Sequence, residues 1–400
     1  MGSKEIFRAL RHRNYRLFFA GQAVSLVGTW MQMIGQSWLV YELTHSSFWL
    51  GVIGFVGSLP ILLFSLFGGA LADRLPKRRL ILGFQTTLMV LALVLGVLTA
   101  LRWVTVGQVA VLAFFIGLVG AFEIPARQSF LIEMVGKEDI GNAVALNSTL
   151  FNAARLIGPA LAGALIGSAG TAVCFFVNGA SFLAVIAGLL MMKLPARASA
   201  SRSTSVFQST LDGLRYIRQT PAVLALVIMV GTVTIFGWSY TVVMPVFADE
   251  ILHVGGRGLG WLVSGSGLGA VIAGLTLAAI GDKLRPRRLA FTGLGIFCVA
   301  VTAMALSKTF WLSVALMVLV GFGQVTFFAT CNTTLQRRVP DEMRGRVMGI
   351  YAFVFMGFFP LGSLQAGLLA HWRGAPFAVI CGAVVCALAA IIVARRVPPV

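Results

Sequence analysis

Arg155 is the only charged residue near the middle of a long apolar run. It belongs to a polar face made by Ser148, Asn152, Arg155 and Pro159, whose spacing of 4, 3 and 4 residues is that of one side of an α-helix. An ionised guanidinium is costly when it faces lipid, so we expect this side chain to face a water-filled cavity or a polar partner. There it could bind a neutral or anionic ligand; the alternative is a structural role, bonded to a carbonyl or a neighbouring glutamine.

A second polar face lies in the first apolar run of the chain. Gln22, Ser25, Thr29, Gln32 and Gln36 recur at spacings of 3, 4, 3 and 4 residues. Two polar faces on otherwise apolar helices predict a central aqueous cavity. Gln32 and Gln36 are therefore candidate substrate-binding residues, as are Asn152 and Arg155.

Aromatic and amide side chains lie near the expected centres of three further apolar runs. The candidates for substrate contact among them are Trp238, Tyr240, Gln324, Phe328 and Tyr351. Such side chains suit a bulky amphiphilic ligand, because rings stack on its apolar part while a few polar groups orient it. For each of them the alternative is plain core packing or an interfacial aromatic belt.

The composition shows what kind of molecule must position these residues. Of the 400 residues, 58% are in the set AVILMFWYC and only 11% are charged, against about 25% charged in soluble domains. This excludes an ordinary soluble enzyme, a disordered chain and a nucleic-acid-binding domain. Four scattered histidines, five cysteines inside apolar runs and the lack of clustered catalytic acids predict neither an enzyme nor a metal or other cofactor.

Apolar runs long enough to cross a membrane recur along the whole chain. A hydrocarbon core about 30 Å thick needs roughly 20 apolar residues in a helix, and this rule gives twelve spans, with the fourth at 104–126 and the fifth at 142–168. The extended non-apolar stretch 193–220 contains a short amphipathic helix and separates 1–192 from 221–400. We expect an all-α membrane protein of two six-helix bundles, monomeric, with a first span that is retained.

Basic residues in short loops predict the orientation of the spans. In an alternating register, 26 of the 31 Lys and Arg residues fall on the side of the N-terminus, whereas only Arg102, Arg257, Lys308 and Arg373 fall on the other. Both termini are therefore predicted to be cytoplasmic, in a bacterial-type inner membrane. The same dispersal over separate loops argues against a nucleic-acid surface.

A repeat links the two halves. The segments LADRLPKRRL (71–80) and IGDKLRPRRL (280–289) follow the second and eighth spans at an offset of 209 residues and share, among others, Asp73/Asp282 and Arg78/Arg287. This predicts two equivalent bundles related by an axis along the membrane normal.

Three motifs resemble signatures of the major facilitator superfamily. GALADRLPKRR (69–79) is similar to its loop motif, with Pro76 in place of a glycine; RLIGPALAG (155–163) resembles the antiporter signature, and LQRRVPDEMRGRVMGIY (335–351) resembles a loop of drug, macrolide and siderophore exporters. The resemblance implies a secondary transporter that exports a small amphiphilic molecule by rocking its two bundles in the lipid bilayer. A lipid or lysolipid flippase is an alternative, and a non-transporting receptor is an alternative of another class.

The resemblance also implies residues that control the conformational change. The first loop is expected to latch the two halves, with Asp73 at the start of another helix and Lys77 paired with Glu123, whereas Arg78 and Arg79 are interpreted as topology determinants. Small residues and a proline in the fifth span are expected to set helix approach and a kink. The full set of gating candidates is Asp73, Arg74, Lys77, Glu123, Gly158, Pro159, Gly163, Asp282, Arg344 and Arg346.

The energy source depends on a titratable group that can be reached from both sides. The thirteen acidic residues lie mostly in loops or at span ends. Glu123, at the inner end of the fourth span, is the best candidate for proton coupling.

Overall fold

The computed structural model describes residues 7–193 and 206–396, nearly all of them helical. The first half contains η1 (Arg8–Arg11), α2 (Arg13–Thr44), α3 (Ser47–Arg74), α4 (Lys77–Ala100), α5 (Val106–Ala169) and α6 (Thr171–Met191). Between the halves lies α7 (Val206–Gln219). The second half contains α8 (Pro221–Thr232), η2 (Val233–Gly237), η3 (Trp238–Val243), α9 (Met244–Val246), η4 (Phe247–Ile251), α10 (Gly255–Ile280), η5 (Gly281–Lys283), α11 (Pro286–Leu306), α12 (Phe310–Arg338), α13 (Asp341–Gly357), α14 (Phe359–Arg373) and α15 (Ala375–Arg396).

These elements make twelve crossings within the described residues, as the sequence predicts. Eleven helical stretches are long and apolar enough to span a membrane, and the longest of them, α5, is two helices joined at Gly136, whose φ of 75° is non-helical. The seventh crossing runs from α8 to η4, and the eleventh joins α13 to α14. The all-α class is confirmed.

The connection between the fourth and fifth crossings differs from the expected boundaries. Helix continues past 126 as far as Gly136 and resumes at once, so the expected loop is helical. The reason is an apolar helix face. The polar residues of this stretch lower its mean hydropathy, so an apolar-run rule misses this face, but Phe130, Leu131 and Met134 are buried in one cluster with Tyr15 and Phe18 of α2. Because this face is packed, the helix is stable well beyond the apolar run.

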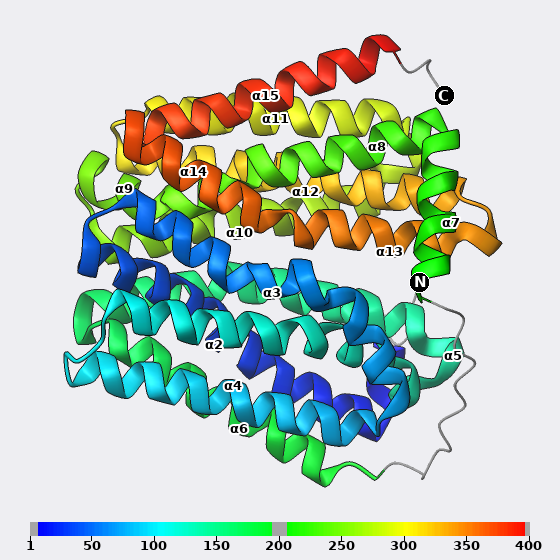
Figure 1. The fold of residues 1–400 in the computed structure, drawn as a ribbon, viewed down its shortest axis with the longest axis horizontal. Helices are drawn as coiled ribbons and strands as arrows, with labels where there is room; N and C mark the ends of the chain where they lie inside the picture. Colours follow the sequence, from blue (N-terminus) through cyan, green and yellow to red (C-terminus); the bar gives the residue numbers. More distant parts are fainter. Residues whose placement is uncertain (1–6, 194–205, 397–400) are drawn as a thin grey trace.

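The halves form two groups of helices, which lie one above the other in Figure 1. We call the end of the molecule that carries α7 and the Leu75–Pro76 turn the linker end, and the end that carries the turns at His45 and Gly170 the distal end. Helix α7 confirms the expected amphipathic helix and packs on α13, where Arg346 donates to Asp212 at 3.1 Å. The remaining part of the expected linker, 194–205, lies outside the described residues.

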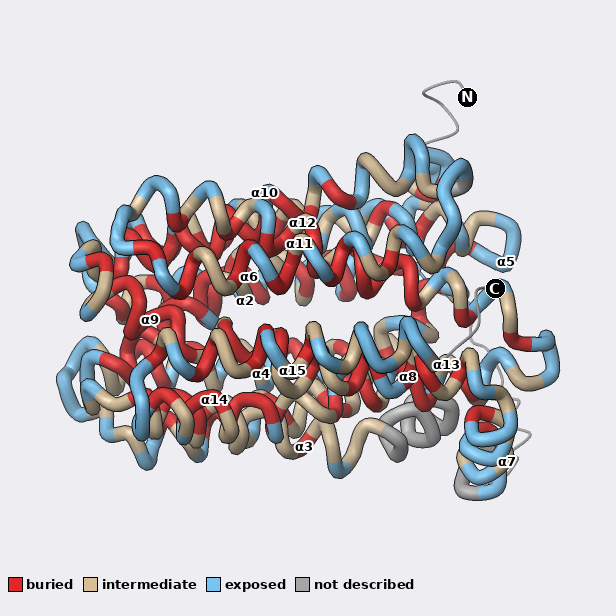
Figure 2. Tube along the Cα trace, turned by 90° about the horizontal axis from the view of Figure 1, so that it is seen from above, coloured by how far each residue is buried: buried red, intermediate tan, exposed pale blue. Residues whose placement is uncertain are grey.

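Contacts between the bundles include close approaches in the distal half of the helices. Gly51 of α3 approaches Gly367 of α14 so closely that a Cβ on Gly51 would lie 2.8 Å from the Cα of Gly367. Tyr41 of α2 donates to Glu250 of η4 at 2.8 Å. Figure 2 shows buried residues toward the middle of the molecule and exposed residues along the outward sides of the helices and at both ends. The distal ends of the two bundles are therefore packed together.

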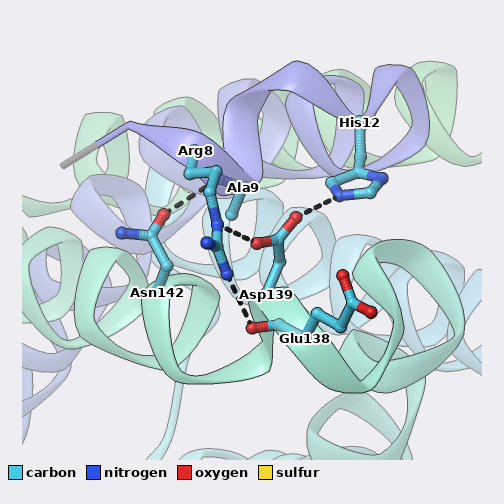
Figure 3. Close-up of polar contacts among 6 residues, drawn as sticks. All are labelled: Arg8, Ala9, His12, Glu138, Asp139 and Asn142. Atoms are coloured by element: carbon cyan, nitrogen blue, oxygen red, sulfur yellow. Dashed lines mark hydrogen bonds and ion pairs between the residues drawn. The ribbon is translucent and has the colours of Figure 1, made fainter. Parts of the chain in front are cut away.

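Polar contacts at the linker end hold the helices of the first bundle together. Arg8 and His12, from η1 and the start of α2, both bind the carboxylate of Asp139, with 2.7 Å between His12 Nε2 and Oδ2 (Figure 3). In the same cluster Asn142 accepts a bond from the Ala9 amide at 2.9 Å. These contacts fix the N-terminal segment on the turn between the two parts of α5.

Candidate substrate site between the bundles

Arg155 crosses from the first bundle to the second at mid-depth. It lies 14 residues before the distal end of α5, or about 21 Å along the helix. Its Nη2 donates to Ser266 Oγ of α10 at 3.1 Å and to Gln324 Oε1 of α12 at 3.0 Å. Only 8% of Arg155 is exposed. The guanidinium is thus held between the halves by neutral oxygen atoms.

Close backbone approach between α5 and α10 brings Arg155 within reach of the second bundle. A Cβ on Gly267 would lie 2.7 Å from the Arg155 carbonyl oxygen, and one on Gly260 would lie 2.4 Å from that of Pro159. Ser264 also donates to the Leu156 carbonyl at 2.7 Å. Small residues therefore let these two helices touch along about two turns, as packing in membranes favours.

Two buried hydrogen-bond donors beside Arg155 are free. The hydroxyl of Tyr240 lies next to the guanidinium and next to Ser266, but it forms no well-aligned hydrogen bond with any described residue. Because arginine can only donate, the oxygen of the Gln324 amide must face it, which leaves Gln324 Nε2 without a partner among the described residues. Both residues are 2% exposed. Unsatisfied buried donors are uncommon and mark places where a ligand or water can bind.

The seventh crossing is irregular where Tyr240 and Trp238 lie. Residues 233–237 form a π-helix and residues 238–243 a 3-10 helix, between ordinary α-helical turns. Such departures within a membrane helix occur mostly at functional sites and change the direction of neighbouring side chains. The eleventh crossing is likewise interrupted, at Phe358 between α13 and α14.

An aromatic group lies beside these donors. The ring of Trp238 is 5.1 Å from that of Phe355 and 5.6 Å from that of Phe359, and Phe328 is 4.8 Å from Phe355. Tyr351 stacks parallel to Phe355 at 6.0 Å and donates to the Phe328 carbonyl at 3.3 Å. We call Trp238, Phe328, Phe355 and Phe359 the aromatic cluster. Since Phe328 follows Gln324 by one helical turn toward the linker end, the cluster adjoins the polar group on that side.

Other residues singled out in the sequence form no described hydrogen bond with Arg155. Gln32 accepts from Asn178 of α6 at 2.6 Å, so its carbonyl oxygen is used inside the first bundle. Asn152 donates to the Ser148 carbonyl of its own helix at 2.8 Å, and Gln36 is half-buried. The structure therefore brings together Arg155, Tyr240 and Gln324, with Trp238 and Phe328 beside them.

Ser266 is a contact that the sequence did not single out. The run Gly265-Ser266-Gly267 indicates only helix packing, because serine is common among small residues at helix interfaces. Its hydroxyl nevertheless holds Arg155. A signal was present in principle, since a hydroxyl in the middle of a small-residue face can bond across to a neighbouring helix.

The gating residues of the first loop have other partners than expected. Lys77 Nζ lies 2.6 Å from Glu133, so the expected pairing with Glu123 is wrong; the longer fourth helix brings Glu133 to the loop instead. Glu123 binds Arg127 one turn away at 3.1 Å and Gln85 at 3.3 Å. The side chains of Asp73, Arg74 and Asp282 lie outside the described residues.

The other gating candidates fall into two groups. Arg344 pairs with Asp341 at 2.5 Å and binds the Gln336 carbonyl, closing the turn before α13, whereas Arg346 binds the linker helix α7. Gly158, Pro159 and Gly163 all lie on the distal part of α5; Gly158 faces α2, while Gly163 and the Pro159 carbonyl face α10.

Arg78 does more than mark topology. It donates to the carbonyls of Leu189 at 2.7 Å and Leu190 at 2.9 Å, in the last turn of α6. Arg287, its counterpart in the repeat, donates to the Ala394 carbonyl at 2.7 Å, near the end of α15. Both arginines therefore satisfy carbonyls at a helix C-terminus.

Known proteins resemble this chain over almost its whole length. It is 25% identical to the staphyloferrin A transporter of Staphylococcus aureus, with 90% of each chain covered, and 27% identical to the multidrug efflux pump Tap of Mycolicibacterium fortuitum, with 87% of each covered. The enterobactin exporter EntS of Escherichia coli is 23% identical over 85% of this chain and 81% of its own.

Solved structures share the fold. A bacterial homologue of the human lysosomal transporter Spinster superposes with a TM-score of 0.76 at 13% identity, covering 98% of this chain and 96% of its own. A D-xylose–proton symporter superposes with a TM-score of 0.72 at 14% identity, covering 98% of both. A family model described as transmembrane secretion effector matches residues 5–400. The chain therefore belongs to the transmembrane secretion effector family, a branch of the major facilitator superfamily.

Proposed function

We propose that this protein is a secondary transporter that exports small amphiphilic molecules across a bacterial inner membrane by alternating access. The observation that carries the proposal is the polar group formed by Arg155, Tyr240 and Gln324 at mid-depth between the bundles, with the aromatic cluster beside it. Relatives named as an enterobactin exporter and a multidrug efflux pump support the direction and the kind of substrate.

The proposed orientation places the linker end in the cytoplasm, together with both chain termini. It rests on the 26 basic residues expected on that side against four on the other. Since the bundles are packed together at the distal end, that end would be the closed side in this conformation, and it would have to open to release a substrate.

The proposed mobile units are the two bundles, 1–192 and 221–400, joined by 193–220. To open the distal end, the close contact of Gly260 with α5 and the bond between Tyr41 and Glu250 must separate. The bonds from Arg155 to Ser266 and Gln324 also cross between the bundles. A substrate that replaces the partners of Arg155 would lower the cost of breaking these bonds, which is how binding can favour the change.

Proton coupling is proposed through Glu123. This carboxylate is 7% exposed and is held by Arg127 and Gln85, in the first bundle. Protonation would weaken its ion pair with Arg127. Glu123→Gln should then abolish the acceleration of transport by a pH gradient, with transport down a substrate gradient retained; a response to the pH gradient that persists in this variant would exclude the role.

Uptake into everted membrane vesicles tests the main proposal. In such vesicles the cytoplasmic side faces outward, so an exporter concentrates its substrate inside. Erythromycin, enterobactin and an amphiphilic dye are offered to vesicles with and without the protein. We expect saturable uptake of at least one compound only where the protein is present; uptake of none would refute the export function.

A further inference from the structure

We infer that the polar group between the bundles binds an anionic head group, a carboxylate in particular, and that the substrates of this transporter are organic acids with an apolar body. This inference rests on the proposed export function and names the substrate class of the same site. The site consists of Arg155, Tyr240 and Gln324, with Ser266 at its edge.

The charge of Arg155 has no counter-ion among the described residues. Its hydrogen-bond partners are the neutral side chains of Ser266 and Gln324, and the neutral phenol of Tyr240 is adjacent. Burial of an arginine in a membrane protein is costly unless an opposite charge or several acceptors compensate it. A bound carboxylate would supply the missing negative charge, whereas a cationic ligand would add a second positive one.

The free donors match an anion. Both hydrogen bonds described for Arg155 are made by Nη2, and the Tyr240 hydroxyl lies beside the guanidinium. Tyr240 O–H and Gln324 Nε2–H have no hydrogen-bond partner among the described residues. A carboxylate is an acceptor of about four hydrogen bonds and pairs well with the planar guanidinium fork. Two neutral donors without an acceptor thus lie beside one positive group that has only neutral partners.

The surroundings define the rest of the ligand. The aromatic cluster adjoins the polar group toward the linker end, and Trp238 and Phe355 in it are only partly buried. A head group bound at Arg155 would leave the attached body in contact with these rings. An acid with an aromatic or otherwise flat apolar body therefore fits better than a small hydrophilic acid.

Matched pairs of acids and their methyl esters test the inference. Pyrenebutyrate and 2-naphthoxyacetate, each with its methyl ester, are titrated into the full chain in lipid nanodiscs at neutral pH, with empty nanodiscs as the correction for membrane partition. We expect each acid to bind about tenfold more tightly than its ester, the size expected for a hydrogen bond to a charged group. Equal binding of acid and ester, or no binding of either, would overturn the inference.

Variants locate the binding to these residues. Gln324→Glu places a carboxylate at the position now occupied by the amide, 3.0 Å from Arg155, and should remove the preference for the acid while ester binding is kept. Arg155→Gln should also remove it. A preference that survives either change would place the anion elsewhere.

Two buried tyrosines provide a matched control. Tyr240→Phe removes a free donor and should weaken binding of the acids about threefold, whereas Tyr351→Phe removes a hydroxyl already bonded to the Phe328 carbonyl and should not. Equal effects of the two changes would contradict the role given to Tyr240. Vesicle uptake of neutral compounds without any acid preference would refute this inference alone, and uptake of no compound would refute the export function.

Discussion

The two bundles are alike at the linker end and different at the centre. Arg78 and Arg287 occupy equivalent positions of the repeat and bind carbonyls at the ends of α6 and α15. At the centre, the first bundle provides the charge, on a helix that stays α-helical around Arg155, whereas the second provides neutral donors and aromatic rings. The second bundle does so on crossings interrupted by π, 3-10 and broken segments.

This difference distinguishes residues that stabilise the fold, which are equivalent in the two halves, from the residues of the proposed substrate site, which are not. Equivalent loops and caps are required in both halves, because each bundle must end its helices at the same membrane surface. The acid with an apolar body that we propose as the substrate would need a charge on one side and rings on the other. The central residues have therefore diverged between the halves, while the linker-end caps have kept equivalent roles.

The largest effect should follow the loss of the central charge. Arg155→Gln should lower transport of an acidic substrate by about a hundredfold, since it removes charge-assisted bonds worth about 3 kcal/mol or less in total. Initial rates of vesicle uptake measure this. The control is Arg257→Gln, an exposed arginine at the distal end of α10, which should transport normally. If both variants lost the same activity, the central position of the charge would not matter.

The next effect concerns the close approach of the bundles. Gly267→Ala places a Cβ 2.7 Å from the α5 backbone and should push α5 and α10 apart at the distal end. Gly274→Ala, two turns further along the same helix, meets no atom within 4 Å and should leave the structure unchanged. We expect the first change to lower transport about tenfold, since a steric clash in a packed interface costs about 1–3 kcal/mol.

Distances between spin labels can show this separation directly. Labels at Arg102 and Lys308, on exposed distal turns of the two bundles, would be attached in a background without the five native cysteines. A shift to longer distances in Gly267→Ala but not in Gly274→Ala is expected. The same distance distribution in both variants would show that Gly267 is not needed for distal closure.

The sequence predicted the parts of this molecule that depend on hydropathy and on the repeat. Twelve crossings, the amphipathic linker helix and the polar partners of Arg155 follow from apolar length and from a charge in the middle of an apolar run. These properties are local, so they do not depend on how the helices are rotated against one another.

The sequence failed where rotation or helix length decides the contact. The bond of Gln32 to Asn178 was not foreseen, because the polar face of α2 turns toward α6 within its own bundle; the role of Gln32 in substrate binding stays a prediction. Lys77 was assigned to Glu123, but the additional turns of α5 present Glu133 to it. The bond of Ser266 and the free donors of Tyr240 and Gln324 depend on the direction of side chains across a helix interface. No periodic pattern or residue spacing in a single sequence indicates that direction.

A smaller effect is expected at the distal hydrogen bond between the bundles. Tyr41→Phe removes the donor to Glu250 and should favour distal opening by about 1 kcal/mol, the usual net contribution of one hydrogen bond. The labels at Arg102 and Lys308 should then report a larger population of long distances than in the unchanged protein. This increase should be smaller than the increase caused by Gly267→Ala. If Tyr41→Phe gave a larger population of long distances than Gly267→Ala, the Tyr41–Glu250 bond would contribute more to distal closure than the Gly267 contact.

The smallest effect is expected at the symmetric caps, where the two halves should respond alike. Arg78→Gln and Arg287→Gln each remove bonds to carbonyls at a helix end, and both arginines are half-buried, so each change should lower the free energy of unfolding by about 1 kcal/mol. Their exposed neighbours Arg79 and Arg288 form the control pair, for which the melting temperature should hardly change. Thermal unfolding in detergent measures all four variants.

Transport per folded molecule should stay normal in both cap variants, because these caps lie far from Arg155. A transport defect in only one cap variant would show that the functional asymmetry of the bundles extends to the linker end.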